Sequence, residues 1–300
     1  MEVSDSILVH YDGKGQQIQS HLMPSLLVAS SVKAFETLYS EAFKEANRVY
    51  GCKIETGTYI QGGFNPGSLK WLQKLVSKQA EEQLTVDGLS PQAKVPNAVS
   101  KVISILTRAH ANMPEIVIRE APEGFEVELE GENVAADELE CAILTNEKIR
   151  KAISDLAQPL KQEGIDTLTI DSCGHSFEPI KIEKDSAKSL IQKKTHVSLV
   201  EEGSFDGFYK VEDLSYNPSK AWKFISIKKP SDTFSATIED DVFWKSVASN
   251  TEKFSCDDIM EIHVSWRKIK KSFSGRAKTT YVVTSIRHYD KDQGDPWKLL

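Results

Sequence analysis

The hydrophobic period of this chain changes once, around residues 178–195, and this change limits the folds that the chain can adopt. Before it, apolar residues recur every three or four positions over long stretches, a spacing typical of amphipathic helices. After it, short segments alternate apolar and polar residues between turn residues, a pattern typical of strands. The sequence therefore predicts two domains, residues 1–180 and 196–300, joined by a linker over residues 181–195.

The first domain is expected to combine about three helices with a sheet, which makes the fold class α+β. The clearest helix covers residues 24–51, where one apolar stripe runs along the helix and Gly51 is placed to end it. Further helices are expected within residues 95–112 and 145–164. Strands are expected at "EIVIREAPEGFEVELEG" and "IDTLTID", and "SILVHYDG" with "GQQIQSHLM" predicts an opening hairpin. "SLKWLQKLVSKQAEEQL" fits either a strand or a helix, and a strand that continues into a short helical or loop segment is favoured.

The second domain is expected to be a small all-β barrel of the SH3-like or OB-like kind. Its strand candidates are "HVSLVEEGSF", "GFYKVEDLSY", "KAWKFISIKK", "TFSATIE", "IMEIHVSWRKI" and "TTYVVTSIRHY". "DDVFWKSVAS" is long enough for one helical turn.

Composition predicts a cytoplasmic protein with no membrane partner. Four cysteines in 300 residues, with no C-x-x-C pair, indicate reduced thiols rather than a disulfide framework. The apolar stretches are too short to span a bilayer, and the acidic N-terminus does not resemble a signal peptide. A net charge of −7 argues against general affinity for nucleic acid, although a local patch can still bind it.

A series of motifs in the first domain resembles a group of uncharacterised bacterial proteins. These are "I-L-V-x-Y-D-G", "H-x-M", a long helix ending in "E-A-N-x-x-x-G", then "G-S-L", "I-R-K-A-I-x-D-L-A-x-P-L" and "G-I-D-T-L-T-I". The resemblance covers roughly residues 5–185 and extends more loosely over the rest, and Leu69 departs from the aromatic residue common there. It implies an α+β domain followed by a small β-domain, encoded near mobile-element or phage-related genes. It implies no active site.

The run "RKIKKSFSGRAK" is the strongest candidate for a binding surface. Its cations and neighbouring aromatic residues suit a single-stranded nucleic acid, in which lysines meet phosphates and rings stack on bases. The alternative is the solvated tip of a hairpin, or a sheet edge that lysines protect from aggregation. The candidate residues are Arg267, Lys268, Lys270, Lys271, Arg276 and Lys278, with Trp266 and Phe273.

Two further groups suggest chemistry more weakly. His10, Asp12 and His21 flank the expected opening hairpin and could serve acid–base catalysis, or Asp12 is simply the turn residue. Cys173 and His175 form one tight pair, whereas a zinc site needs four ligands. The chain lacks "G-x-S-x-G" and "H-E-x-x-H". We therefore assign no catalytic residue, metal or cofactor.

These observations favour a non-enzymatic binding or adaptor protein, with a phage-defence or mobile-element context implied by the resemblance. Its expected partner is another protein or a second copy of the chain. The alternatives are a nucleic-acid or nucleotide binder acting through the basic hairpin, and a metal-dependent hydrolase or nuclease.

Overall fold

The computed structural model describes residues 2–16, 20, 23–65, 69–79, 89–109, 115–129, 131–174, 177–192, 196–255 and 258–289. The chain divides into two compact units. Unit 1 consists of Met1–Leu199 with Lys271–Gly275, and unit 2 consists of Val200–Lys270 with Arg276–Leu300. Helices and two sheets are both present, which confirms the α+β class.

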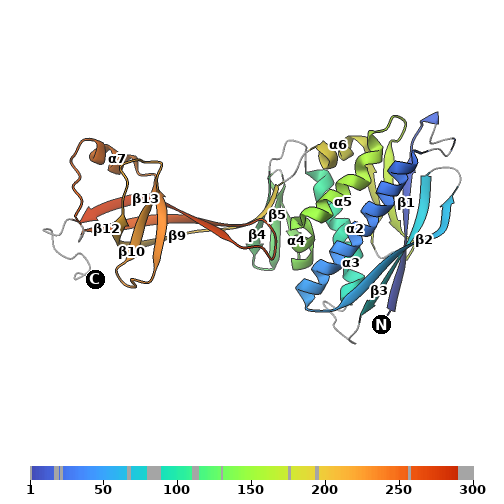
Figure 1. The fold of residues 1–300 in the computed structure, drawn as a ribbon, viewed down its shortest axis with the longest axis horizontal. Helices are drawn as coiled ribbons and strands as arrows, with labels where there is room; N and C mark the ends of the chain where they lie inside the picture. Colours follow the sequence, from blue (N-terminus) through green and yellow to red (C-terminus); the bar gives the residue numbers. More distant parts are fainter. Residues whose placement is uncertain are drawn as a thin grey trace. The chain divides into compact units, whose positions relative to one another are not determined.

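Unit 1 is built on a five-stranded antiparallel sheet with the order β2-β3-β1-β7-β8. The strand bounds are β1 Glu2–Asp12, β2 Ile54–Asn65, β3 Leu69–Gln79, β7 Thr167–Ser172 and β8 Ile180–Glu183. One face of the sheet is buried by residues such as Val9, Trp71 and Ile170, which alternate along their strands. Helices α2, α3 and α5 cover this face, and no described helix lies over the other face (Figure 1).

The three predicted helices are confirmed. They are α2 Ser25–Tyr50, α3 Pro91–Arg108 and α5 Glu147–Ala157. Gly51 ends α2 with a φ of 62°, a left-handed conformation that costs glycine little. The 3₁₀ helix η1, Gln158–Lys161, follows α5, so Pro159 lies just beyond its end.

Two helices of unit 1 were not predicted. α4, Glu138–Thr145, begins with a capping box formed by Asp137 and Glu140, and seven of its eight residues are buried. Because nearly all of its residues are buried, apolar residues are not confined to one stripe that a helical period would detect. α6, Lys184–Gln192, falls in the segment expected to be a linker. Its Ala187 is buried in the core of unit 1, so this segment is part of the folded unit.

A three-stranded meander completes unit 1. The hairpin predicted there is confirmed as β4 Glu115–Ala121 and β5 Gly124–Leu129, and β6 Glu132–Ala136 pairs with β5. The buried residues of the meander share one core with the helices, which therefore lie between it and the five-stranded sheet (Figure 1).

The expected opening hairpin was wrong. β1 pairs with β3 along one edge and β7 along the other, so both of its hydrogen-bonding edges are occupied. Most of "GQQIQSHLM" lies outside the described residues.

Unit 2 contains five strands and one helix among its described residues. Their bounds are β9 His196–Asp213, β10 Trp222–Ser226, β11 Thr233–Ile238, α7 Asp241–Ala248, β12 Ile259–Lys270 and β13 Lys278–Tyr289. The strand order is β10-β11-β13-β12-β9, and β10 also pairs with β9. β11 and β13 are parallel. The first residues of β9 belong to unit 1, where they pair with β4. Aromatic side chains, including Trp222 and Phe224, fill the core.

Candidate functional site

An apolar groove lies beside the first turns of α2. Its volume is about 930 Å³. α2 contributes residues one step around the helix from its main buried stripe, and β2 contributes alternate residues from the helix-covered face of the sheet. The lining residues used below are Met23, Val28, Val32, Thr58, Ile60 and Gln73.

The groove is apolar with a polar floor and charged flanks. The Gln73 side chain is buried and its Oε1 accepts a hydrogen bond from Trp71 Nε1 at 3.0 Å, so the floor is fixed in place. Lys33 and Glu36 lie along α2 at the side of the groove. Ile60 remains 43% exposed on the opposite wall, which is a large exposure for an aliphatic side chain.

β2 is an edge strand, and it differs from the edge strand on the other side of the sheet. β8 has only four residues and presents Lys181 and Glu183 outward, two features that protect a sheet edge. β2 has twelve residues and pairs only with β3 among the described strands. Its outer edge therefore offers backbone groups for pairing with another strand, directly beside the groove.

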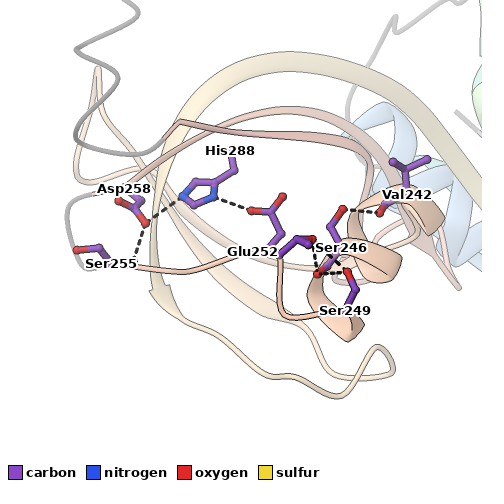
Figure 2. A network of polar contacts seen from close by, with 8 residues as sticks. Val242, Ser246, Ser249, Glu252, Ser255, Asp258 and His288 are labelled. Atoms are coloured by element: carbon purple, nitrogen blue, oxygen red, sulfur yellow. Dashed lines mark hydrogen bonds and ion pairs between the residues drawn. The ribbon is translucent and has the colours of Figure 1, made fainter.

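A buried polar cluster in unit 2 joins the segment after α7 to β13 (Figure 2). His288 Nδ1 lies 2.9 Å from Glu252 Oε2, and His288 Nε2 lies 2.9 Å from Asp258 Oδ2. The side chain of His288 is 10% exposed and that of Asp258 is 3% exposed. The imidazole ring is thus held between two carboxylate groups, one facing each of its nitrogens.

This cluster has a structural rather than a metal-binding geometry. Both imidazole nitrogens already face carboxylate oxygens, so neither is directed at an open ligand position. Within the described ranges, no group of His, Cys, Asp and Glu side chains is arranged to hold a metal ion. The cluster fixes the chain that follows α7 against β13.

Carboxylates neutralise two cations of the basic run. Lys268 Nζ lies 2.9 and 2.8 Å from the two carboxylate oxygens of Glu201, and Arg267 Nε lies 3.0 Å from Glu202 Oε1. Both acids lie on β9, so the pairing arises from strands far apart in the sequence. The run therefore carries less free charge than its sequence indicates.

The two aromatic residues of the run are already in contact with protein. A Cβ added at Gly203 would lie 2.7 Å from Trp266 Cζ2, so the indole ring rests on the backbone of β9. The tip Lys271–Gly275 belongs to unit 1, where the ring of Phe273 packs edge-on against Phe125 at 5.8 Å. The Phe273 N–H donates to Thr145 Oγ1 at 3.1 Å. The alternative of a tip that projects into water is therefore wrong for Phe273.

The remaining basic residues of the run are divided between the units. Lys270, Arg276 and Lys278 belong to unit 2, and Lys271 belongs to unit 1. Lys271, Arg276 and Lys278 are exposed and Lys270 is half-buried. Binding of nucleic acid by these residues stays a prediction.

The weaker chemical candidates are only partly described. His10 lies on the helix-free face of β1, and Asp12 Oδ1 accepts a hydrogen bond from the N–H of Gly13 at 2.8 Å, as expected for a turn residue. Cys173 is exposed. His21 and His175 lie outside the described residues.

Sequence reasoning missed both the groove and a group of lysines on β3. Lys70 and Lys74 alternate with the buried residues of β3, on the face that no helix covers. The spacing in "LKWLQKLVSK" was a usable signal for these lysines once the segment was assigned as a strand. The groove had no local signal, since it joins residues of three separate elements.

Comparisons with protein-family models, with curated proteins and with solved structures find no match to this chain. None of the helices in the described part of the chain has both the length and the apolar character needed to cross a membrane.

Proposed function

We propose that this protein is a non-enzymatic binding protein that takes up an extended apolar segment of a protein partner along β2. The observation that carries this proposal is the adjacency of an apolar groove of about 930 Å³ and a twelve-residue edge strand that pairs only with β3 among the described strands. An added strand would gain main-chain hydrogen bonds from β2, and every second side chain would enter the groove.

The chemistry of the groove defines the segment that fits it. Val28, Val32 and Ile60 favour aliphatic or aromatic side chains at alternate positions. Lys33 and Glu36 beside the groove favour polar or charged residues between them. A single extended segment is sufficient for such recognition, and no catalytic group is required.

Selection from a library of displayed peptides tests this function and requires no purified partner. We expect selection on the purified protein to enrich peptides with apolar residues at alternate positions. Ile60→Glu should weaken their binding at least about tenfold, because burial of one aliphatic side chain contributes about 2 kcal/mol. Val242→Glu is the matched control, since Val242 is 73% exposed on α7 in unit 2.

N-methylation of the selected peptide tests the strand pairing itself. Backbone methyl groups at alternate positions on the edge facing β2 should abolish binding, whereas methyl groups on the other edge should leave it unchanged. Equal effects at all positions would contradict strand addition. Enrichment that is identical on the Ile60→Glu and wild-type proteins would contradict the groove.

We also propose that unit 2 is a small OB-like barrel. The pairing of β10 with both β11 and β9 supports closure of the sheet in the order β9-β10-β11-β13-β12-β9. The position of α7 between the third and fourth strands supports the same assignment. Barrels of this kind commonly bind oligonucleotides through strand faces and loops. Here the pairing of Arg267 and Lys268 with carboxylates weakens the case for a nucleic-acid site on the basic hairpin.

The biological setting is likewise a proposal. The resemblance to bacterial proteins encoded near mobile-element or phage-related genes supports a role in a phage-defence or mobile-element system, in the cytoplasm. Affinity purification from the native host tests it: a partner lost specifically from the Ile60→Glu protein would connect that setting to the groove.

A further inference from the structure

The helix-free face of the five-stranded sheet in unit 1 carries a row of lysines. Lys70, Lys74 and Lys78 lie along this face of β3. Across the part of the chain that the structure describes, no carboxylate lies within ion-pair distance of Lys70 or Lys74. Lys78 lies opposite Glu55 and is left out of the site.

Neutral residues surround these two lysines on the neighbouring strands. Lys74 lies between Ser6 on β1 and Tyr59 on β2, and Lys70 lies opposite His10 on β1. Between them, Leu72 is flanked by Leu8 and Gln61. The nearest acidic residues, Glu55, Asp12 and Asp171, lie at the ends of the patch or on the next strand. The patch is therefore positively charged within an acidic protein.

An exposed aromatic ring lies beside Lys74. Tyr59 is 61% exposed, and its ring rests on Gly57: a Cβ at Gly57 would lie 3.1 to 3.3 Å from the Tyr59 hydroxyl and ring atoms. The absence of a side chain at Gly57 allows the ring to lie against the strand. The outward side of the ring remains available for stacking.

His10 adds a polar group without a partner. Its Nε2 atom is buried and has no hydrogen-bond partner within the described residues. Burial lowers the pKa of His10, opposed by Asp12 and assisted by Lys70, so the ring is neutral at pH 7. A neutral imidazole can donate a hydrogen bond to a ligand that lies across the face, or accept one from it.

From this geometry we propose that the helix-free face of unit 1 binds a single strand of nucleic acid. Lys70 and Lys74 contact phosphates, and Tyr59 stacks on a base. The two lysines are four residues apart on one strand, about 14 Å along it, which is about the rise of four stacked nucleotides. Charge complementarity and an exposed ring on the same flat surface are the features of a single-strand platform. This face lies opposite the α2–β2 groove, so one unit can hold a peptide segment and a nucleic acid together.

Fluorescence anisotropy with labelled oligo-dT and oligo-U of about 20 nucleotides tests this proposal. We expect micromolar binding at about 50 mM salt that weakens roughly five- to tenfold at about 200 mM salt, as two phosphate contacts on a single strand require. Lys70→Glu with Lys74→Glu should weaken binding at least about tenfold. Lys271→Glu with Arg276→Glu is the charge-matched control in the basic run and should have a much smaller effect.

More conservative variants distinguish a loss of nucleic-acid binding from a loss of folding. Lys70→Gln with Lys74→Gln removes the charges without reversing them, and should halve or abolish the salt dependence. Tyr59→Ser should weaken binding about tenfold while Tyr59→Phe retains it, because stacking requires the ring and not the hydroxyl. Gly57→Ala should weaken binding, because the added Cβ displaces the Tyr59 ring. The fold should tolerate this change, since the Cβ meets only the end of the Tyr59 side chain.

Losses confined to the β3 and Tyr59 variants support the single-strand site. No binding at about 50 mM salt overturns the proposal. Equal losses in the β3 and basic-run double variants also overturn it, because net charge alone would explain them. Duplex DNA or polyglutamate binding as tightly as the oligonucleotides overturns the single-strand assignment.

Discussion

The basic side chains of unit 2 differ from those on the helix-free face of unit 1 in their pairing with carboxylates. In unit 2, Arg267 and Lys268 pair with acids on β9, and His288 lies between two carboxylates. On the face of unit 1, Lys70 and Lys74 have no acidic partner among the described residues, and His10 has a buried, unpartnered nitrogen. The number of basic residues in each stretch of sequence would instead have favoured the basic run over the face of unit 1 as the binding surface.

The difference between the two regions shows that cross-strand neighbours decide whether a cation is available to a ligand. A lysine opposite a glutamate is held in an ion pair, and such a lysine contributes less to phosphate binding because the pair must first separate. A lysine with neutral cross-strand neighbours, such as Lys74 between Ser6 and Tyr59, keeps its charge free. The following variants test whether the pairing in unit 2 and its absence in unit 1 have these consequences.

The largest expected effect concerns the histidine that is paired in unit 2. His288→Ala should lower the free energy of unfolding by about 3 kcal/mol, because it leaves the buried Asp258 carboxylate without the imidazole nitrogen that faces it. Chemical denaturation followed by tryptophan fluorescence measures the loss, because Trp222 lies in the core of this unit.

His263→Ala is the control for that experiment. His263 Nδ1 lies 2.6 Å from Asp206 Oδ1, but both side chains are exposed, 40% and 78% respectively. The loss should therefore stay below about 1 kcal/mol. Similar losses for the two histidines would mean that burial does not distinguish them.

A smaller effect is expected from releasing the paired cations of the basic run. Glu201→Gln with Glu202→Gln should free Lys268 and Arg267, and so raise the affinity of the protein for oligo-dT several-fold at low salt. The slope of log affinity against log salt should steepen by about 1.4, the value for two added phosphate contacts on a single strand. Anisotropy titrations at several salt concentrations measure both quantities.

The matched control carries the same change of net charge elsewhere. Glu163→Gln with Glu178→Gln alters two exposed acids on either side of β7 in unit 1, and among the described residues neither acid forms an ion pair with the basic run. If this variant gains as much affinity as the first, long-range charge rather than released ion pairs accounts for the gain.

The smallest expected effect is the pH dependence due to His10. Burial lowers its pKa below the ordinary 6.5, so between the two pKa values the unfolded chain binds more protons than the folded chain. Stability should therefore fall as the pH drops through 6.5 and level off below the folded pKa.

His10→Gln should remove this part of the pH dependence, with a difference of less than about 1 kcal/mol between about pH 7 and about pH 5. Denaturation curves at several pH values compare the two proteins. An unchanged pH dependence in the variant would assign the effect to another group.

Periodicity in the sequence determined much of the architecture. Residues 24–51 predicted α2 and its end at Gly51, because a helix needs a local apolar stripe and a residue that tolerates positive φ. The alternation in "EIVIREAPEGFEVELEG" predicted β4 and β5 for the same reason, since strand and helix periods are properties of neighbouring residues. α4 was not predicted in this way because it is buried on nearly every side.

Tertiary structure alone decided which side chains are available to bind a ligand. The sequence placed Lys268 in a basic run and Lys74 in an ambiguous strand, but it could not show that one lies against Glu201 and the other lies between Ser6 and Tyr59. Those neighbours come from strands 67 and about 15 to 70 residues away along the chain. Local periodicity records the conformation of a segment, whereas charge neutralisation and groove formation depend on pairing across long separations, and the register of that pairing is fixed only when the whole core packs.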